Sequence, residues 1–274
     1  MTAWRPLRSF DRARLAAARV QAHHATQWLA RTARAYVPAR SDDTHTNLGW
    51  DDAFGGLTSH PLPDGARLGL RLADLTLALF STDASAPHDA FPLAGRHDPD
   101  ACAWLMDHAA MRHLDPGALD VPLPYMLAEK PDDGAYTVDA EALGEPAAWF
   151  SNANVSLGAI RERIVTRGIA APPVCCWPHH FDLDTLVTVA PGRTTGIGFE
   201  PGDAYYDEPY FYVSVYPAPD AAALPPLPAI GHWHTRNFTA AVATASQIYG
   251  AQDQGGAVDA FLRAASDATI KSLS

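Results

Sequence analysis

The clearest strand in this sequence reads Tyr210-Phe211-Tyr212-Val213-Ser214-Val215-Tyr216, and it lies in a strand-rich block that begins at Val174. Side chains on a strand alternate between its two faces, so this stretch has one aromatic face and one mixed face. A second strand-rich block covers residues 47–96, where turns rich in Gly, Pro and Asp separate short apolar runs. That block predicts an antiparallel meander of three or four strands.

Helices are expected around the strand-rich blocks. Residues 11–36 are rich in Ala, Arg, Leu and Gln and contain no Gly or Pro, which predicts one long helix. A second helix is expected over residues 100–112, with Asp98 as its N-cap and Pro99 in its first turn. The other expected elements are a helix over 139–167 with a break near 151–154, a strand over 230–236, and closing helices over 238–249 and 257–273.

We therefore expect a single α+β domain over residues 1–274. Its antiparallel strands would form one or two sheets, covered by the long N-terminal helix and the C-terminal helices. Blocks of strands and blocks of helices follow one another, which argues against a doubly wound parallel sheet. A length of 274 residues fits one large domain, and no linker is polar enough to mark a boundary.

The composition of the chain limits which partners it can bind and in which cellular compartment it is expected. The formal net charge of −11 disfavours nucleic acid and anionic membranes, because both are bound chiefly through clustered Lys and Arg. The sequence has no signal-peptide pattern and no apolar run of about 18 residues. Its three cysteines show no disulfide pattern. We therefore expect a cytoplasmic protein.

No nucleotide cofactor is expected. The sequence contains no Walker loop, and Gly196-Ile197-Gly198 lacks the third glycine and the following helix of a dinucleotide fingerprint. There is also no Gly-x-Ser-x-Gly elbow for a nucleophilic serine.

A divalent metal is one candidate cofactor, because histidines occur in pairs near two expected strands. Imidazole nitrogen and carboxylate oxygen suit zinc, iron or manganese. On a strand, His180 would share a face with Asp182, whereas adjacent histidines would point to opposite faces. The spacing matches no metalloenzyme motif, so packing or hydrogen bonding at a sheet rim is the competing explanation. The candidate metal ligands are His179, His180, His232 and His234. With Asp182 added to the cluster, the alternative function is a metal-dependent enzyme.

A polar pocket for a small metabolite is the leading functional hypothesis. His23, Gln27 and Arg31 recur every four residues, so they form a polar line on one face of the first helix. That line could bind an anionic or amide-bearing ligand, or it could be a solvated surface. In an enzyme, His180 would be the general base, oriented by Asp182 or Asp203. The expected ligand-binding residues are His23, Gln27, Arg31, Tyr210 and Tyr212, and the expected catalytic residues are His180, Asp182 and Asp203.

Residues 198–203, Gly-Phe-Glu-Pro-Gly-Asp, predict a turn. Its glycines permit positive φ or close approach of another group. Asp203 would either stabilise the turn itself or orient a histidine.

The competing class of function is a non-catalytic interaction protein. In that case the aromatic strand and the Pro-rich loop over residues 217–228 would form the surface of a homo-oligomer.

A series of short motifs, in the same order over most of the chain, carries a family resemblance. The motifs are His23 and Gln27 with Arg31, Gly56-Leu57-Thr58, Trp177 with Phe181-Asp182-Leu183, Gly198-Phe199-Glu200-Pro201-Gly202, Tyr216-Pro217-Ala218-Pro219 and Phe261-Leu262. In these the sequence resembles a bacterial family known as domain of unknown function 5996. The family has small or polar residues where this chain has His179 and His180, which weakens a metal role for that pair. The resemblance implies one continuous fold and no known activity.

Overall fold

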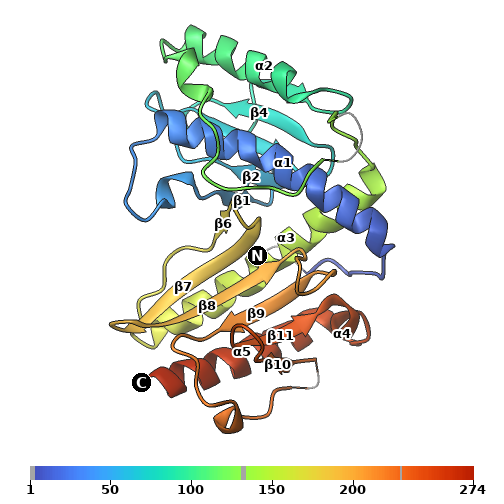
Figure 1. Cartoon of the computed structure of the whole chain (residues 1–274), viewed down its shortest axis with the longest axis vertical. Coiled ribbons are helices and arrows are strands. Elements are labelled where there is room, and N and C mark those ends of the chain that lie inside the picture. The colour runs from blue at the N-terminus through green and yellow to red at the C-terminus, as the bar shows by residue number, and fades with distance from the viewer. Residues whose placement is uncertain (1–3, 131–133, 229) are drawn as a thin grey trace. The chain divides into compact units, whose positions relative to one another are not determined.

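The structure is a computed structural model, and it describes residues 4–130, 134–228 and 230–274. It contains two antiparallel sheets together with long helices at both ends of the chain, so the α+β prediction is confirmed (Figure 1). Within those described residues, no helix is both long enough and apolar enough to cross a membrane.

The chain divides into two compact units, each of which contains one of the sheets. The first-sheet unit comprises residues 13–147 together with the segment 176–181. The second-sheet unit comprises the chain before residue 13, residues 148–175 and residues 182–274. The prediction of a single domain therefore stays a prediction.

The first-sheet unit is built on a meander in which each strand pairs with the next along the chain. The strands are β1 (Gly49–Asp51), β2 (Gly56–Thr58), β3 (Arg67–Arg71), β4 (Thr76–Phe80) and β5 (Asp89–Pro92). The meander over 47–96 is thus confirmed, with five strands in place of three or four because β1 and β2 are only three residues long.

Two helices accompany this sheet, α1 (Arg12–Tyr36) and α2 (Asp98–Met111). Thr32 of α1, Leu68 of β3 and Leu105 of α2 line one small cavity, so the helices and the sheet share a core. The N-cap of α2 is His97 and not Asp98 as predicted. The reason is a capping box, in which the Asp100 carboxylate accepts the backbone N–H of His97.

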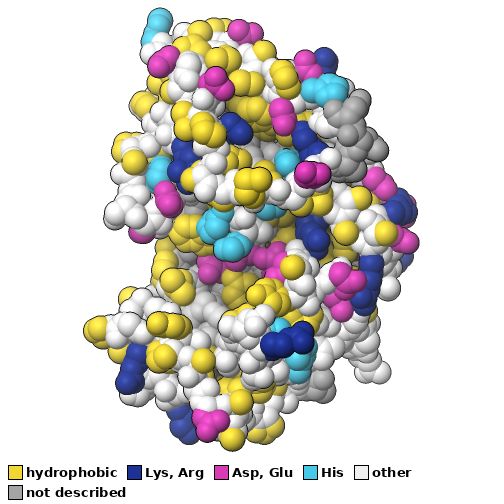
Figure 2. All heavy atoms as spheres, in the orientation of Figure 1, with side chains coloured by type: hydrophobic (Ala, Val, Ile, Leu, Met, Phe, Trp, Pro, Cys, Tyr) yellow, Lys and Arg dark blue, Asp and Glu magenta, His cyan; other side chains and the backbone are white. Residues whose placement is uncertain are grey.

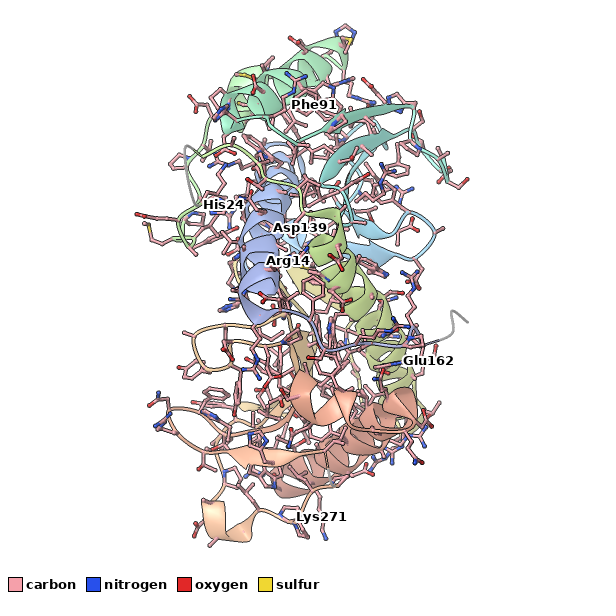
Figure 3. All side chains as sticks on the ribbon, turned by 90° about the vertical axis from the view of Figure 1, so that its right-hand side faces the viewer. Arg14, His24, Phe91, Asp139, Glu162 and Lys271 are labelled. Carbon is pink, nitrogen blue, oxygen red and sulfur yellow. The ribbon has the colours of Figure 1, made fainter. Side chains whose placement is uncertain are left out.

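An ion pair joins α1 to the residues before α3 (Ala140–Thr166). Figure 3 shows Arg14 beside Asp139, and the guanidinium donates to both carboxylate oxygens at 2.9 Å. The predicted break of α3 near 151–154 is wrong, because the helix is continuous there. The polar residue Asn152 is accommodated inside it because its side chain hydrogen-bonds the backbone N–H and C=O of Arg5.

The second-sheet unit holds five strands of a six-stranded sheet, in the order β10-β11-β9-β8-β7. The sixth strand, β6 (Cys175–Trp177), carries the chain across the boundary between the units. The five strands are β7 (Asp182–Ala190), β8 (Arg193–Glu200), β9 (Tyr210–Ser214), β10 (His232–His234) and β11 (Ala240–Thr244). They are followed by the helices α4 (Ala245–Tyr249) and α5 (Gln254–Leu273).

The predicted helix over 238–249 is therefore wrong in its first half and correct in its second, which is α4. Its first half is strand β11, which pairs with β9 on one side and β10 on the other. Every residue of Ala240–Thr244 is buried. Alanine favours a helix in an isolated peptide. Here the segment is extended because it pairs with a strand on each side, so tertiary packing overrides local propensity.

The two faces of this sheet differ in chemistry. Phe199 and Phe211 point to one face, where both rings lie against Trp149 of α3. Thr195 belongs to the same face and meets Thr269 of α5. Side chains alternate along each strand, so the residues between these positions face the opposite side. That opposite side carries the polar residues considered next.

Candidate functional site

The polar face of the second sheet brings together several of the residues singled out in the sequence. Antiparallel pairing aligns Asp184 with Gly198, Gly198 with Tyr212, and Tyr212 with Val242. His232 pairs with Val242 and ends this row at the edge of the sheet. We define the polar face by the side chains of Asp182, Asp184, Glu200, Tyr210, Tyr212, Ser214, His232 and His234.

Gly198 makes room on this face for Tyr212. A Cβ atom at Gly198 would overlap the Tyr212 ring and its hydroxyl. The ring therefore lies across β8, and its hydroxyl donates a hydrogen bond of 2.7 Å to Oδ2 of Asp182 on β7. The prediction of a turn beginning at Gly198 is wrong, because β8 continues to Glu200. Gly198 does allow another group to approach the backbone closely, as predicted, and that group is the Tyr212 side chain.

Asp182 is the most unusual group on the polar face. Its side chain is buried, and Oδ1 has no hydrogen-bond partner among the described residues. Burial raises the pKa of the carboxyl to about 6, although the hydrogen bonds from Tyr212 and from the backbone N–H oppose the shift. Asp182 therefore changes its charge close to neutral pH and offers one buried acceptor atom.

The surroundings of Asp182 are acidic. Burial raises the pKa of the Tyr212 phenol well above its usual value, and the nearby charges of Asp182, Asp184 and Glu200 raise it further. Burial likewise raises the pKa of the Cys175 thiol to about 12, with the same two aspartates contributing. Cys175 is therefore a poor nucleophile. Asp184 and Glu200 therefore add negative charge near the Asp182–Tyr212 pair.

Asp203 lies in the turn after β8, and the chain itself occupies both of its carboxylate oxygens. Oδ1 accepts the backbone N–H groups of Tyr205 and Tyr206, and Oδ2 accepts the hydroxyl of Tyr210 at 3.0 Å. These bonds favour the structural reading of Asp203, in which the carboxylate stabilises a turn.

His232 and His234 lie on the edge strand β10, on the same side of the sheet. Both approach the hydroxyl of Tyr206, at 3.0 Å for His232 Nε2 and 2.9 Å for His234 Nδ1. The sequence pointed to the two histidines but not to Tyr206, which lies in a loop without any motif.

The other predicted binding residues belong to the first-sheet unit, where they hold backbone segments. Gln27 donates to the carbonyl of Pro178 at 2.8 Å and accepts the hydroxyl of Tyr125 at 2.7 Å. His23 Nε2 lies 2.8 Å from the same carbonyl, and burial lowers the His23 pKa to about 4. A neutral His23 therefore donates to Pro178. Arg31 donates to the carbonyl of Val121. These bonds favour a structural role for the polar line on α1.

Replacing Tyr125 with phenylalanine tests this structural reading. We expect the free energy of unfolding to fall by about 1 kcal/mol, because Gln27 loses one hydrogen bond while the packing of the ring is kept. Urea denaturation would measure the change. Tyr205→Phe is the matched control, since its ring lies at the surface and none of the described hydrogen bonds uses its hydroxyl. An equal loss in both variants would contradict the assignment.

His179 and His180 lie in a turn and not on a strand, so the predicted pairing of His180 with Asp182 on one strand face is wrong. The chain reverses after Trp177, whose carbonyl accepts the N–H groups of His180 and Phe181. Pro178 favours such a turn, and Phe181 takes a φ of 67°, so strand alternation stops here. Both histidines are exposed, and their rings lie 4.2 Å apart.

The described parts of the chain contain no group of three or more His, Cys, Asp or Glu side chains placed to hold a metal ion. The four histidines proposed as ligands are thus two separate pairs, one in each unit. A metal centre built from all four has no support in the geometry of either unit.

Of the two features that the oligomer hypothesis placed at a surface, the aromatic strand is internal and the loop over 217–228 is mostly exposed. The aromatic strand β9 is internal to its sheet, between β8 and β11. The loop over 217–228 folds toward α5 around a cavity of about 320 Å³, lined by residues that include Leu224, Trp233 and Lys271. Figure 3 labels Lys271 near the end of α5. Oligomerisation stays a prediction, and the exposed loop is the part of its proposed surface that the structure leaves available.

Comparison with known proteins adds no assignment. The sequence matches no family model, and neither the curated proteins nor the solved structures give a significant match. On the side of the molecule drawn in Figure 2, the described Lys and Arg side chains are scattered among acidic and apolar ones. Buried polar groups are therefore the better guide to function than any charged patch on that surface.

Proposed function

We propose that the protein binds a small polar molecule on the polar face of the second sheet, with Asp182 as the main contact. The observation that carries this proposal is the buried Asp182 carboxyl, whose Oδ1 atom has no partner among the described residues. A buried acceptor without a hydrogen bond costs about 1–3 kcal/mol, and a ligand that donates to it would remove that cost.

The chemistry of the face selects the class of ligand. The negative charges of Asp182, Asp184 and Glu200 all act on Tyr212. A ligand with an amine, guanidinium or amide N–H group fits that environment better than a carboxylate or a phosphate. The family resemblance suggests a bacterial protein of unknown activity, and the expected cytoplasmic location is compatible with the free thiols of Cys102, Cys175 and Cys176.

Asp182 also replaces His180 as the leading acid–base group in this proposal. Its pKa of about 6 lets it accept and release a proton near neutral pH. His180 lies in a turn of the first-sheet unit. It therefore does not share a strand face with Asp182, which was the reason for pairing the two residues.

A thermal-shift screen tests the proposal with amines, guanidinium compounds and amides against carboxylates of matched size. We expect some N–H donors to raise the melting temperature of the wild-type protein and the carboxylates to leave it unchanged. Asp182→Asn should weaken binding of a cationic ligand by about tenfold or more, since a charge-assisted bond is lost. Affinity for a cation should rise from pH 5 to pH 7, because Asp182 ionises over that range.

Glu162→Gln is the matched control for Asp182→Asn. Glu162 is an exposed residue of α3, labelled in Figure 3, and the substitution also removes one negative charge. Its binding should equal that of the wild type. Ligands that bind Asp182→Asn as tightly as the wild type would refute the proposal.

A further inference from the structure

Three potential metal-ligand atoms meet at the edge of the second sheet. The hydroxyl oxygen of Tyr206 lies 3.0 Å from His232 Nε2 and 2.9 Å from His234 Nδ1. His232 and His234 are alternate residues of β10, so the strand presents both imidazoles on one face. All three side chains are half-buried, so the site is open to small ions.

The proton on His234 can be assigned from its second contact. His234 Nε2 lies 2.6 Å from the backbone carbonyl oxygen of Arg236. A carbonyl only accepts hydrogen bonds, so Nε2 carries the hydrogen, and Nδ1 of the neutral ring carries a lone pair. The single hydroxyl proton of Tyr206 is therefore donated to His234 Nδ1.

His232 contributes the second nitrogen at this oxygen, since its Nε2 atom lies 3.0 Å from the Tyr206 hydroxyl. In the neutral tautomer that carries its hydrogen on Nδ1, His232 presents an Nε2 lone pair to Tyr206. Two imidazole nitrogens and a phenol oxygen thus converge at one point.

We propose that Tyr206, His232 and His234 bind a divalent transition-metal ion. Metal–ligand distances of about 2.0–2.2 Å place neighbouring donor atoms about 3.0–3.5 Å apart, so the 3.0 and 2.9 Å contacts of the Tyr206 oxygen need only a small opening to admit an ion. A metal ion would accept the lone pairs of both imidazoles at once. Zn²⁺ and Cu²⁺ are the ions that two imidazoles and one phenol oxygen suit best.

The outer contact of His234 matches that of a metal-binding histidine. Such a histidine usually donates its second ring N–H to a carbonyl or another fixed acceptor, which holds its tautomer. Arg236 provides that carbonyl for His234. On binding, the phenol proton would be released to solvent as the Tyr206 oxygen becomes a ligand. This site uses neither Asp182 nor Tyr212, so it stands apart from the proposed function.

Isothermal titration with Zn²⁺, Cu²⁺ and Co²⁺ tests the proposal on full-length protein that is free of chelator and carries no polyhistidine tag. The wild type should bind one Zn²⁺ or Cu²⁺ ion. The double variant His232→Ala/His234→Ala should bind it about 100-fold more weakly, because two imidazole ligands are lost. The matched double variant His179→Ala/His180→Ala also removes two imidazoles and should keep the wild-type affinity.

Tyr206→Phe tests the third ligand. Cu²⁺ bound to the wild type should show a phenolate-to-copper absorption band, which this variant should lose while keeping weakened binding through the imidazoles. Titration should also release a proton from the wild type that Tyr206→Phe does not release.

Three results would overturn the proposal. They are a wild type that binds none of the three ions, equal losses in both double variants, and unchanged binding after His232→Ala/His234→Ala. Circular dichroism confirms that each variant is folded. If the alanine variant unfolds, His232→Gln/His234→Gln keeps polar side chains in the site and takes its place in the same comparison.

Discussion

Asp182→Asn is expected to raise the free energy of unfolding by about 2–3 kcal/mol at pH 8 and to change it little at pH 4. The ordinary pKa of an aspartate is about 3.9, and in the folded protein Asp182 has a pKa of about 6. A difference of about 2 pKa units corresponds to roughly 3 kcal/mol. The ionised carboxyl is thus unfavourable in the folded state, and asparagine removes the charge.

The sign of the pH dependence follows from this shift. Between about pH 4 and pH 6 the folded state holds a proton that the unfolded state has lost, so the wild type loses stability as the pH rises through that window. Above pH 6 both states are ionised and the loss is complete. Urea denaturation of both proteins from pH 4 to pH 8 measures the difference. A uniform destabilisation of Asp182→Asn at every pH would contradict the expectation, and Glu162→Gln should show no such trend.

Phe199→Ala is expected to lower the free energy of unfolding by about 3–5 kcal/mol, the usual cost of deleting a fully buried phenyl ring. Phe199 has no exposed surface. Its ring stacks on Trp149 at a centroid distance of 5.6 Å and meets Phe150 edge to face. The deletion would leave a cavity between α3 and the sheet that these rigid rings fill poorly.

Two companion variants show whether the loss comes from that cavity. Leu186→Ala on β7 removes a side chain that is 50% exposed, and it should cost less than about 1 kcal/mol. Phe199→Leu keeps most of the volume and should recover more than half of the loss. Urea denaturation measures all three, and a loss below about 1 kcal/mol in Phe199→Ala would show that the core closes over the gap.

Local signals in the sequence were enough for much of the fold. The helix expected over 11–36 is α1, and the helix expected over 257–273 is α5, because long runs of good helix formers without Gly or Pro have few alternatives. The strand 240–244 was missed because alanine favours helices, and only its place between two other strands makes it extended.

The candidate site was predictable in part. Strand alternation correctly identified Tyr210 and Tyr212 as neighbours on one face, and Asp182 joined them through the order of the strands. Glu200 and Tyr206 were missed, since one lay in an expected turn and the other in a loop. Alternation of Gly196 and Gly198 with apolar residues was the signal for a strand with open space on one face. The prediction that His180 and Asp182 share a strand face is wrong, because a proline-containing turn, not a strand, precedes Asp182.

The segment 176–181 has a consequence for how this chain can be dissected. It lies between two parts of the second-sheet unit, yet its Pro178 carbonyl receives hydrogen bonds from His23 and Gln27 of the first-sheet unit. No single cut therefore yields both units as intact fragments. A fragment that ends at residue 147 would lack this acceptor, so domain swaps and truncation libraries need an added copy of the segment or a circular permutation.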